Sequence, residues 1–470
     1  MLLLIEAFFN PKSVAIIGAT PKEGKVGRVL IENFIKRFKG KIYPVNPSYD
    51  EIMGLKCYKS VKDIQDEIDL AVIAIPAPII PSVLRELGEK NVKNVIIISG
   101  GFRETGTEEG ARLEDEVINI AREYGIRIIG PNCIGIFDNW SGVDTFFLPD
   151  VKMKRPPRGF ISFISQSGAF ASALLDWMAY RGIGVSRAIS YGNKIDIDDV
   201  DLIEFLGNDD KTKVIIMYIE GLKENRGKLF IEKAREVSRN KPIIIYKAGK
   251  TERGSLAASS HTAALAGSYE LYQAAIKQAN LIEARSFDDI MDLTKILLTQ
   301  PVMKGNRVYV ITDAGGVGVM LTDALTSEGL YMPRTPPDLR EELRKILPPH
   351  CIVDNPIDLT GDTDDQRYIN VLEKVIPRED VDAVVVVALP QVPGIRGELF
   401  NYIIEAKRKY DKPLVTVIIG GPEAEKFKNM LEHNEIPVFE SPERAARALG
   451  ALFKYSLTRG VARRYEGGVD

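Results

Sequence analysis

Short, nearly continuous apolar runs alternate along this chain with longer segments of helical periodicity. Runs of this kind, rich in β-branched residues and bounded by glycine or proline, are typical of strands buried on both faces of a parallel sheet. Three successive groups are expected: Ser13–Ile17, Lys41–Val45, Leu70–Ile75, Val95–Ile98 and Arg127–Ile129; then Phe160–Ile164, Ser186–Ile189, Val214–Ile219 and Ile243–Tyr246; then Arg307–Ile311, Ala383–Val387 and Leu414–Ile418.

The pattern therefore predicts an α/β protein built from three consecutive units. A chain of 470 residues agrees with this, since one domain takes roughly 150 residues. The basic, proline-bearing run Lys152–Arg158 is predicted to be a linker. We expect domains at residues 1–150, 159–300 and 304–460, with the helix near Phe287–Leu298 ending the second and one around Pro442–Lys454 ending the third.

Composition narrows the possible partners. The formal net charge of −3 gives no reason to expect nucleic acid or an anionic membrane as a partner. No apolar run approaches the ~20 residues that cross a bilayer, and Met1–Phe9 lacks a basic region and a cleavage site. Three widely spaced cysteines form no metal-ligand pattern and predict reduced thiols. We therefore expect a cytoplasmic protein without a metal site.

A glycine-containing turn follows the first strand of each unit. In the first, Gly18–Gly27, five residues separate the first two glycines, whereas a P-loop has four residues there. Val26 also stands where a P-loop has the Ser or Thr hydroxyl that binds Mg²⁺. It also lacks the dinucleotide pattern G-x-G-x-x-G, and the second strand is followed by Asn46 and Pro47 instead of an acid, which disfavours NAD. A different phosphate-bearing ligand remains possible, as does a turn that binds nothing.

The second and third turns are Ser165–Ala169 and Asp313–Gly318. Each leads from an apolar strand into a predicted helix, whose first N–H groups attract anions. Ser167 and Gly168 in one turn, and Gly315 and Gly316 in the other, are candidate phosphate contacts. A tight connection without ligand is the alternative in each case.

Two further residues suggest chemistry. His261 lies in the segment Ser255–Ser268, which consists mostly of small residues, whereas a core histidine is expected among large apolar neighbours. A neutral imidazole is a good nucleophile near pH 7. Glu220 follows a predicted strand, where its carboxylate could accept a hydrogen bond from one ring nitrogen and leave the other free to attack phosphorus. A surface glutamate is the alternative. For the acids Asp196–Asp201, a solvated helix start is favoured over a cation site.

Taken together, several motifs resemble the ADP-forming acyl-CoA synthetases of the succinyl-CoA synthetase superfamily, most closely the α subunit of the archaeal acetyl-CoA enzymes. These motifs are Gly18–Gly27, Tyr43–Pro47, Gly130–Cys133, Ser165–Ala169, Ser260–Gly267 and Asn355–Gly361. The resemblance covers nearly the whole chain. It implies a Rossmann-like CoA-binding domain followed by two flavodoxin-like ligase domains.

The resemblance also implies roles for individual residues. His261 would be phosphorylated, with Glu220 as its carboxylate partner. Coenzyme A would contact one set of turn residues, namely Gly18, Thr20, Pro21, Lys22, Glu23, Val45, Asn46, Pro47, Ser99, Gly100 and Gly101. Phosphate would contact a second set, namely Gln166, Ser167, Gly168, Gly315 and Gly316. The implied reaction is acyl-CoA + ADP + phosphate ⇌ carboxylate + ATP + CoA, through an acyl phosphate and a phosphohistidine.

The family's nucleotide site lies in an ATP-grasp domain, and no segment of this sequence provides one. The resemblance therefore implies a separate ATP-grasp β subunit that brings Mg-ADP or Mg-ATP, in an α2β2 assembly. Two alternatives stay open at this point: a subunit of a succinyl-CoA-type ligase, and a CoA-binding regulatory protein without turnover. The acyl group is left open as well.

Overall fold

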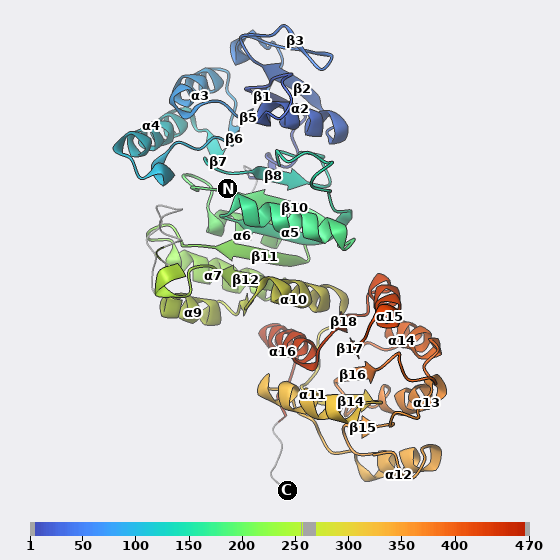
Figure 1. Cartoon of the computed structure of the whole chain (residues 1–470). Helices are drawn as coiled ribbons and strands as arrows, with labels where there is room; N and C mark the ends of the chain where they lie inside the picture. Colours follow the sequence, from blue (N-terminus) through green and yellow to red (C-terminus); the bar gives the residue numbers. More distant parts are fainter. Residues whose placement is uncertain (1–4, 255, 257–268, 466–470) are drawn as a thin grey trace. The chain divides into compact units, whose positions relative to one another are not determined.

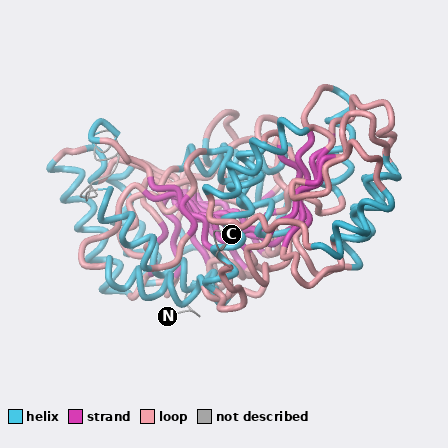
Figure 2. The backbone as a smooth tube through the Cα atoms, turned by 90° about the horizontal axis from the view of Figure 1, so that it is seen from below, coloured by secondary structure: helices cyan, strands magenta, loops and turns pink. Residues whose placement is uncertain are grey.

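The computed structural model describes residues 5–254, 256 and 269–465 (Figure 1). Its contacts divide the chain into two compact units, Met1–Glu283 and Ala284–Asp470. Within each unit the strands run through the interior and the helices lie outside them (Figure 2). Among the described residues, no helix combines the length and the apolar character needed to cross a membrane.

The first unit begins with a five-stranded parallel sheet in the order β2-β1-β5-β6-β7. Val14 and Ile16 of β1 share a core cluster with α2, while Ala15 and Ile17 share another with α3 and α4. Both faces of the strand are thus buried, which explains the unbroken apolar run. The elements are β1 (Ser13–Ile17), α2 (Val26–Arg37), β2 (Lys41–Val45), the hairpin β3 (Glu51–Ile52) and β4 (Leu55–Lys56), β5 (Leu70–Ile73), α3 (Ile80–Glu89), β6 (Asn94–Ile97), α4 (Glu108–Tyr124) and β7 (Arg127–Ile129), with 3-10 turns at Val61–Asp63, Ala77–Ile79 and Arg103–Thr105.

The same unit contains a second sheet, in the order β13-β12-β11-β9-β10-β8. Its strands are parallel except β8, which pairs antiparallel with β10 at one edge. The strand β8 lies within the predicted first domain, yet it completes the second sheet. The elements are β8 (Gly135–Asp138), β9 (Arg158–Ser165), α5 (Gly168–Tyr180), β10 (Val185–Ser190), α6 (Asp199–Asn208), β11 (Val214–Ile219), α7 (Gly227–Ser238), β12 (Ile243–Lys247), α9 (Tyr269–Gln278) and β13 (Ile282–Glu283).

The predicted linker 152–158 is fastened to the first unit. The side chain of Arg155 is 1% exposed, and its Nε lies 2.8 Å from Oδ2 of the buried Asp144. Its Nη2 donates to the carbonyl oxygen of Phe146 at 2.8 Å. Burial raises the pKa of Asp144, and the guanidinium groups of Arg155 and Arg37 oppose that shift. Removing one partner of such a buried pair leaves an uncompensated charge and costs about 3–5 kcal/mol.

The second unit holds a parallel sheet in the order β15-β14-β16-β17-β18. Helix α10 packs against α16, and Arg444 pairs with Asp292 at 2.6 Å. This helix, which the sequence placed at the end of the domain 159–300, thus belongs to the second unit; the three domain boundaries stay predictions. The elements are α10 (Phe287–Thr299), β14 (Val308–Thr312), α11 (Gly315–Ser327), α12 (Pro337–Ile346), β15 (Ile357–Asp358), α13 (Asp365–Val375), β16 (Ala383–Ala388), α14 (Glu398–Lys409), β17 (Leu414–Ile418), α15 (Pro422–His433), β18 (Val438–Phe439) and α16 (Pro442–Thr458).

Candidate active site

The residues predicted to contact CoA follow three strands of the first sheet at their carboxyl ends. Gly18 to Glu23 follow β1, Asn46 and Pro47 follow β2, and Ser99 to Gly101 follow β6. Gly18 has φ +92°, and a Cβ there would lie 2.3 Å from the carbonyl oxygen of Ala74, so only glycine fits. Asn46 Nδ2 donates to the Ala19 carbonyl at 2.8 Å and fixes the turn. The predicted CoA contacts therefore share one edge of the sheet.

The loop after β6, Ser99–Gly101, is held by a carboxylate. Glu104 Oε1 accepts from the N–H of Gly101 at 2.6 Å and from that of Phe102 at 3.2 Å. Ser99 Oγ donates to the carbonyl oxygen of Ile75 at 2.5 Å. These contacts shape the loop before any ligand arrives.

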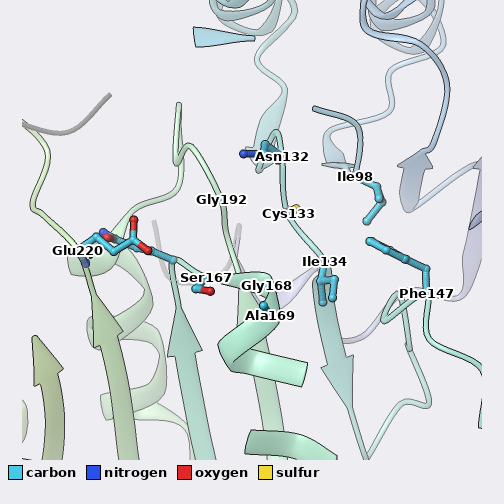
Figure 3. A pocket seen from close by; sticks show the side chains of 11 residues that line it. Ile98, Asn132, Cys133, Ile134, Phe147, Ser167, Gly168, Ala169, Gly192 and Glu220 are labelled. Carbon is cyan, nitrogen blue, oxygen red and sulfur yellow. Dashed lines mark hydrogen bonds between the residues drawn. The ribbon is translucent and has the colours of Figure 1, made fainter. Parts of the chain in front are cut away.

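A cavity of about 320 Å³ lies within the first unit, where residues after β6 and β7 face residues after β9 and β11 (Figure 3). It brings together the predicted phosphate contacts Gln166, Ser167 and Gly168 with the predicted carboxylate Glu220. These four residues are thus neighbours in the structure, while their chemical roles stay predictions. The predicted CoA turns after β1 and β2 do not line this cavity.

The start of α5 forms one wall of the cavity. Ser167 is its N-cap, and Ser167 Oγ accepts from the N–H of Phe170 at 3.2 Å. Gly168 and Ala169, the first two residues of the helix, line the cavity. The first N–H groups of a helix have no acceptor within the helix and carry partial positive charge. This wall is therefore suited to an anion.

Gln166 ties the end of β11 to the helix start. Its Oε1 accepts from the N–H of Glu220 at 2.5 Å and from that of Gly221 at 3.1 Å. Its Nε2 donates to the Gly221 carbonyl at 2.6 Å. One buried amide therefore fixes the backbone that carries Glu220.

The two oxygens of the Glu220 carboxylate have different surroundings. Tyr218 Oη lies 3.4 Å from Oε1, and burial together with the nearby carboxylate raises the pKa of Tyr218, so the phenol keeps its proton as a donor. Oε2 is buried and has no hydrogen-bond partner in the described part of the chain. A buried carboxylate oxygen without a donor is costly, and an incoming N–H or O–H group would satisfy it.

A buried lysine lies beneath the same turn. Lys247 is 2% exposed, and its Nζ donates to the carbonyl oxygens of Glu220, at 2.9 Å, and Ala248. Burial lowers the pKa of Lys247, an effect that the Glu220 charge partly opposes. Through these two hydrogen bonds, the lysine links the backbone at Glu220 to the end of β12.

In the second unit, Gly315 and Gly316 begin α11 after β14 and are exposed. The N-cap Ala314 offers no side-chain acceptor. Asp313, 4% exposed, accepts from the N–H of Leu389 at 2.9 Å through Oδ2, while Oδ1 has no partner in residues 5–254, 256 and 269–465. Burial raises the pKa of Asp313 to about 6.

His261 lies outside the described residues, so its role stays a prediction. The prediction that the acids of Asp196–Asp201 are solvated is wrong for three of them, because Asp198, Asp199 and Asp201 are all less than 6% exposed. Asp198 does start α6, as expected, but its neighbours are satisfied by buried partners, including Lys194 at 2.7 Å from Asp199.

The cavity also contains residues without a predicted role, among them Asn132, Cys133 and Gly192. Burial raises the pKa of the Cys133 thiol to about 12, which makes it a poor nucleophile. Asn132 and Cys133 belong to the motif Gly130–Cys133, so their position in the sequence signalled them. Gly192 carried no such signal, because its place depends on how the turn after β10 meets the end of β7.

Comparison with known proteins agrees with this architecture. Residues 12–138 match a CoA binding domain, residues 158–297 a succinyl-CoA ligase like flavodoxin domain, and residues 308–463 a ligase-CoA domain. The α subunit of acetate–CoA ligase (ADP-forming) I of Pyrococcus furiosus is 43% identical, over 96% of this chain and 98% of its own length. The chain belongs to the ADP-forming acetate–CoA ligase family. The predicted fold class is thereby confirmed.

Further relatives add to this family assignment. The acetate–CoA ligase (ADP-forming) of Methanocaldococcus jannaschii is 43% identical over 96% of this chain, which spans only 63% of that protein. Acetyl-coenzyme A synthetase 1 of Ca. Korarchaeum cryptofilum, solved with phosphate and ADP, matches with a TM-score of 0.90 and 39% identity, over 97% of this chain and 98% of that one. These relatives support the acetyl-CoA synthetase prediction over the succinyl-CoA and regulatory alternatives.

Proposed function

We propose that this chain is the α subunit of an ADP-forming acyl-CoA synthetase, with acetyl-CoA as its substrate. The overall reaction is acyl-CoA + ADP + phosphate ⇌ carboxylate + ATP + CoA. The observation that supports this most directly is one cavity lined by both the start of α5 and Glu220, whose Oε2 has no hydrogen-bond partner among the described residues. An anionic phosphoryl group and the N–H of a neutral imidazole ring are the two partners that this pair of features suits.

The proposed reaction takes three steps. Phosphate attacks the thioester carbonyl, which gives acyl phosphate and releases CoA as a thiol. An imidazole nitrogen of His261 then attacks the phosphorus of the acyl phosphate, and the carboxylate leaves. Finally, a β-phosphate oxygen of ADP takes the phosphoryl group, which gives ATP and frees the histidine.

The residues of the cavity serve the second step. Glu220 Oε2 accepts the N–H of the histidine nitrogen that does not attack, and it stabilises the positive charge that develops on the ring. Gln166 keeps the carboxylate in place through its bonds to the Glu220 and Gly221 amides. The N–H groups of Gly168 and Ala169 receive the phosphoryl oxygens.

Coenzyme A is proposed to bind along the edge formed by Gly18–Glu23, Val45–Pro47 and Ser99–Gly101, where exposed polar and backbone groups are available. Gly315 and Gly316 are proposed as a second phosphoryl contact. A separate ATP-grasp β subunit, in an α2β2 assembly, is proposed to bind Mg-ADP or Mg-ATP. The proposed location of the assembly is the cytoplasm.

The test is phosphoryl transfer from ³²P-labelled phosphate, supplied with acetyl-CoA to the chain together with its β subunit. We expect acid-labile label on the wild-type chain and ATP formation when ADP is added. His261→Ala abolishes both while CoA still binds, and His433→Ala is the matched control. Label or ATP formation in His261→Ala would refute the assigned nucleophile, and an unlabelled wild type would favour the regulatory alternative.

A further inference from the structure

The turn between β10 and α6, residues 191–198, covers the outer edge of β7 in the first sheet. The N–H of Asn193 donates to the Pro131 carbonyl at 3.0 Å, and the N–H of Ile195 to the Gly130 carbonyl at 3.2 Å. Gly192 makes this approach possible, because a Cβ there would lie 2.2 Å from two carbonyl oxygens. Through these hydrogen bonds, the turn that follows β10 of the second sheet is joined to the residues that follow β7 of the first sheet.

The side chain of Asn193 reaches toward the loop that is proposed to bind CoA. Its Nδ2 donates to Glu104 Oε2 at 2.6 Å and to Glu114 Oε2 at 2.9 Å. The other oxygen of Glu104 holds the N–H of Gly101. Asn193 Oδ1 accepts from Nδ2 of Asn132, a cavity residue, at 3.3 Å. One amide therefore contacts the support of the CoA loop and the wall of the cavity.

The next residue, Lys194, reaches toward Glu220. It is 6% exposed, and its Nζ lies 2.7 Å from Asp199 Oδ2 and 2.5 Å from the carbonyl oxygen of Gly221. Asp199 Oδ1 accepts from the Tyr191 hydroxyl at 2.6 Å and from Gln166 Nε2 at 3.3 Å. This buried network fixes the same peptide that Gln166 holds.

We propose that Asn193 and Lys194 are positioning residues that hold the Ser99–Gly101 loop and the Glu220 turn in one register, so that CoA and phosphate bind with positive coupling. The inference rests on the proposed function, since it takes the ligands of the two sites from it. A ligand that orders the loop would also order Glu104 and Asn193, and through the Asn193–Lys194 backbone the Glu220 turn. Coupling of this kind is reciprocal between the two ligands.

The experiment measures the CoA dissociation constant of the full chain by calorimetry, without phosphate and with saturating inorganic phosphate. CoA and phosphate cannot react with each other, so the ratio of the two constants reports coupling alone. We expect a ratio of about fivefold or more for the wild type, at the lower end of typical coupling. We expect Asn193→Ala to bring the ratio close to one.

Two further variants make the result specific. Asn193→Asp keeps the size of the side chain but removes both donors and faces Glu104 and Glu114 with a like charge, so it should also abolish the coupling. Asn208→Ala, at the exposed end of α6, should keep the wild-type ratio. Thermal melts identify any variant that fails to fold, and Asn193→Gln then takes its place, with partial coupling expected from the retained amide.

The possible outcomes separate the two proposals. A wild-type ratio of one, or an unchanged ratio in Asn193→Ala, overturns the positioning role while the proposed function stands. Failure of the wild type to bind either ligand removes the proposed function, and this inference with it.

Discussion

The start of α5 and the start of α11 both follow a buried parallel strand through a glycine-containing turn, but their first turns are built differently. The N-cap of helix α5 is Ser167, whose hydroxyl oxygen accepts from the N–H of Phe170. The N-cap of helix α11 is Ala314, which provides no side-chain cap. The start of α5 thus has a side-chain cap from its own N-cap residue. The start of α11 has none from its N-cap residue, so its first amides are left to another partner.

The surroundings of the two helix starts differ as well. Gly168 lines the cavity, and a Cβ added to it would lie 3.6 Å from the apolar side chain of Ile134. At Gly315 an added Cβ would lie 2.6 Å from Asp358 Oδ2, and Asp313, just before the helix, has one oxygen without a hydrogen-bond partner in the part of the chain that the structure describes. A phosphoryl group at α11 would therefore meet two carboxyl groups, whereas at α5 it meets Glu220 and a polar amide. Two similar glycine patterns thus lead to different electrostatic sites.

The substitution with the largest expected effect tests whether phosphoryl transfer to the chain depends on the cavity at the start of α5. Glu220→Gln keeps the shape of the side chain but cannot stabilise a positive imidazole ring. We expect a loss of about 100-fold in acyl-phosphate-dependent labelling of the chain, within the range for acid–base groups. Glu224→Gln, exposed in the same loop, is the control and should stay within twofold. Equal activity of the two variants would contradict the proposed role of Glu220.

The next effect concerns the acid at α11. The pKa of Asp313 is about 6, above its value of 3.8 in the unfolded chain, so the folded protein binds more protons between these values. Stability of the wild type should therefore fall as pH rises from about 4 to 6, and stay low above this range. Asp313→Asn removes this dependence.

The measurement is urea unfolding of Asp313→Asn and wild type at pH 4 and pH 7. The stability of the variant relative to wild type should rise by about 2 kcal/mol between the two pH values. Asp323→Asn, exposed on α11, is the control. A constant difference between Asp313→Asn and wild type would show that Asp313 ionises normally, and the electrostatic contrast between the two helix starts would be lost.

The smallest expected effect exchanges the caps. Ser167→Ala should destabilise the first unit by about 1 kcal/mol, because α5 loses its N-cap. Ala314→Ser should stabilise the second unit by about 0.5 kcal/mol, because the new hydroxyl can cap an amide of α11. Denaturant unfolding of both variants checks this. Effects of the same sign would mean that the two helix starts are not capped as the structure indicates.

Much of the fold could be predicted from local pattern. The runs at Ser13–Ile17, Val214–Ile219 and Leu414–Ile418 coincide with strands in the structure, because strands covered on both faces need apolar side chains at every position. The strand β8 was missed, since its four residues form a strand only by pairing with β10 from elsewhere in the chain.

The candidate site was likewise predicted only in part from the sequence. Sequence order indicated Gln166, Ser167, Gly168 and Glu220, because residues that follow parallel strands meet at one edge of the sheet. The roles of Asn193 and Lys194 could not be predicted, since an exposed-looking polar turn is indistinguishable in sequence from one that covers a neighbouring sheet.

By itself the sequence determined the parallel sheets, the helices that follow their glycine turns and the family of the chain, because each of these depends on residues close together in the sequence or on motifs that persist in it. Only the tertiary structure decided which carboxylates are buried, which are paired and which oxygen of Glu220 receives no donor from the described residues. These properties depend on charges and hydrogen-bond partners that reach a residue from distant segments, and a local pattern carries no record of them.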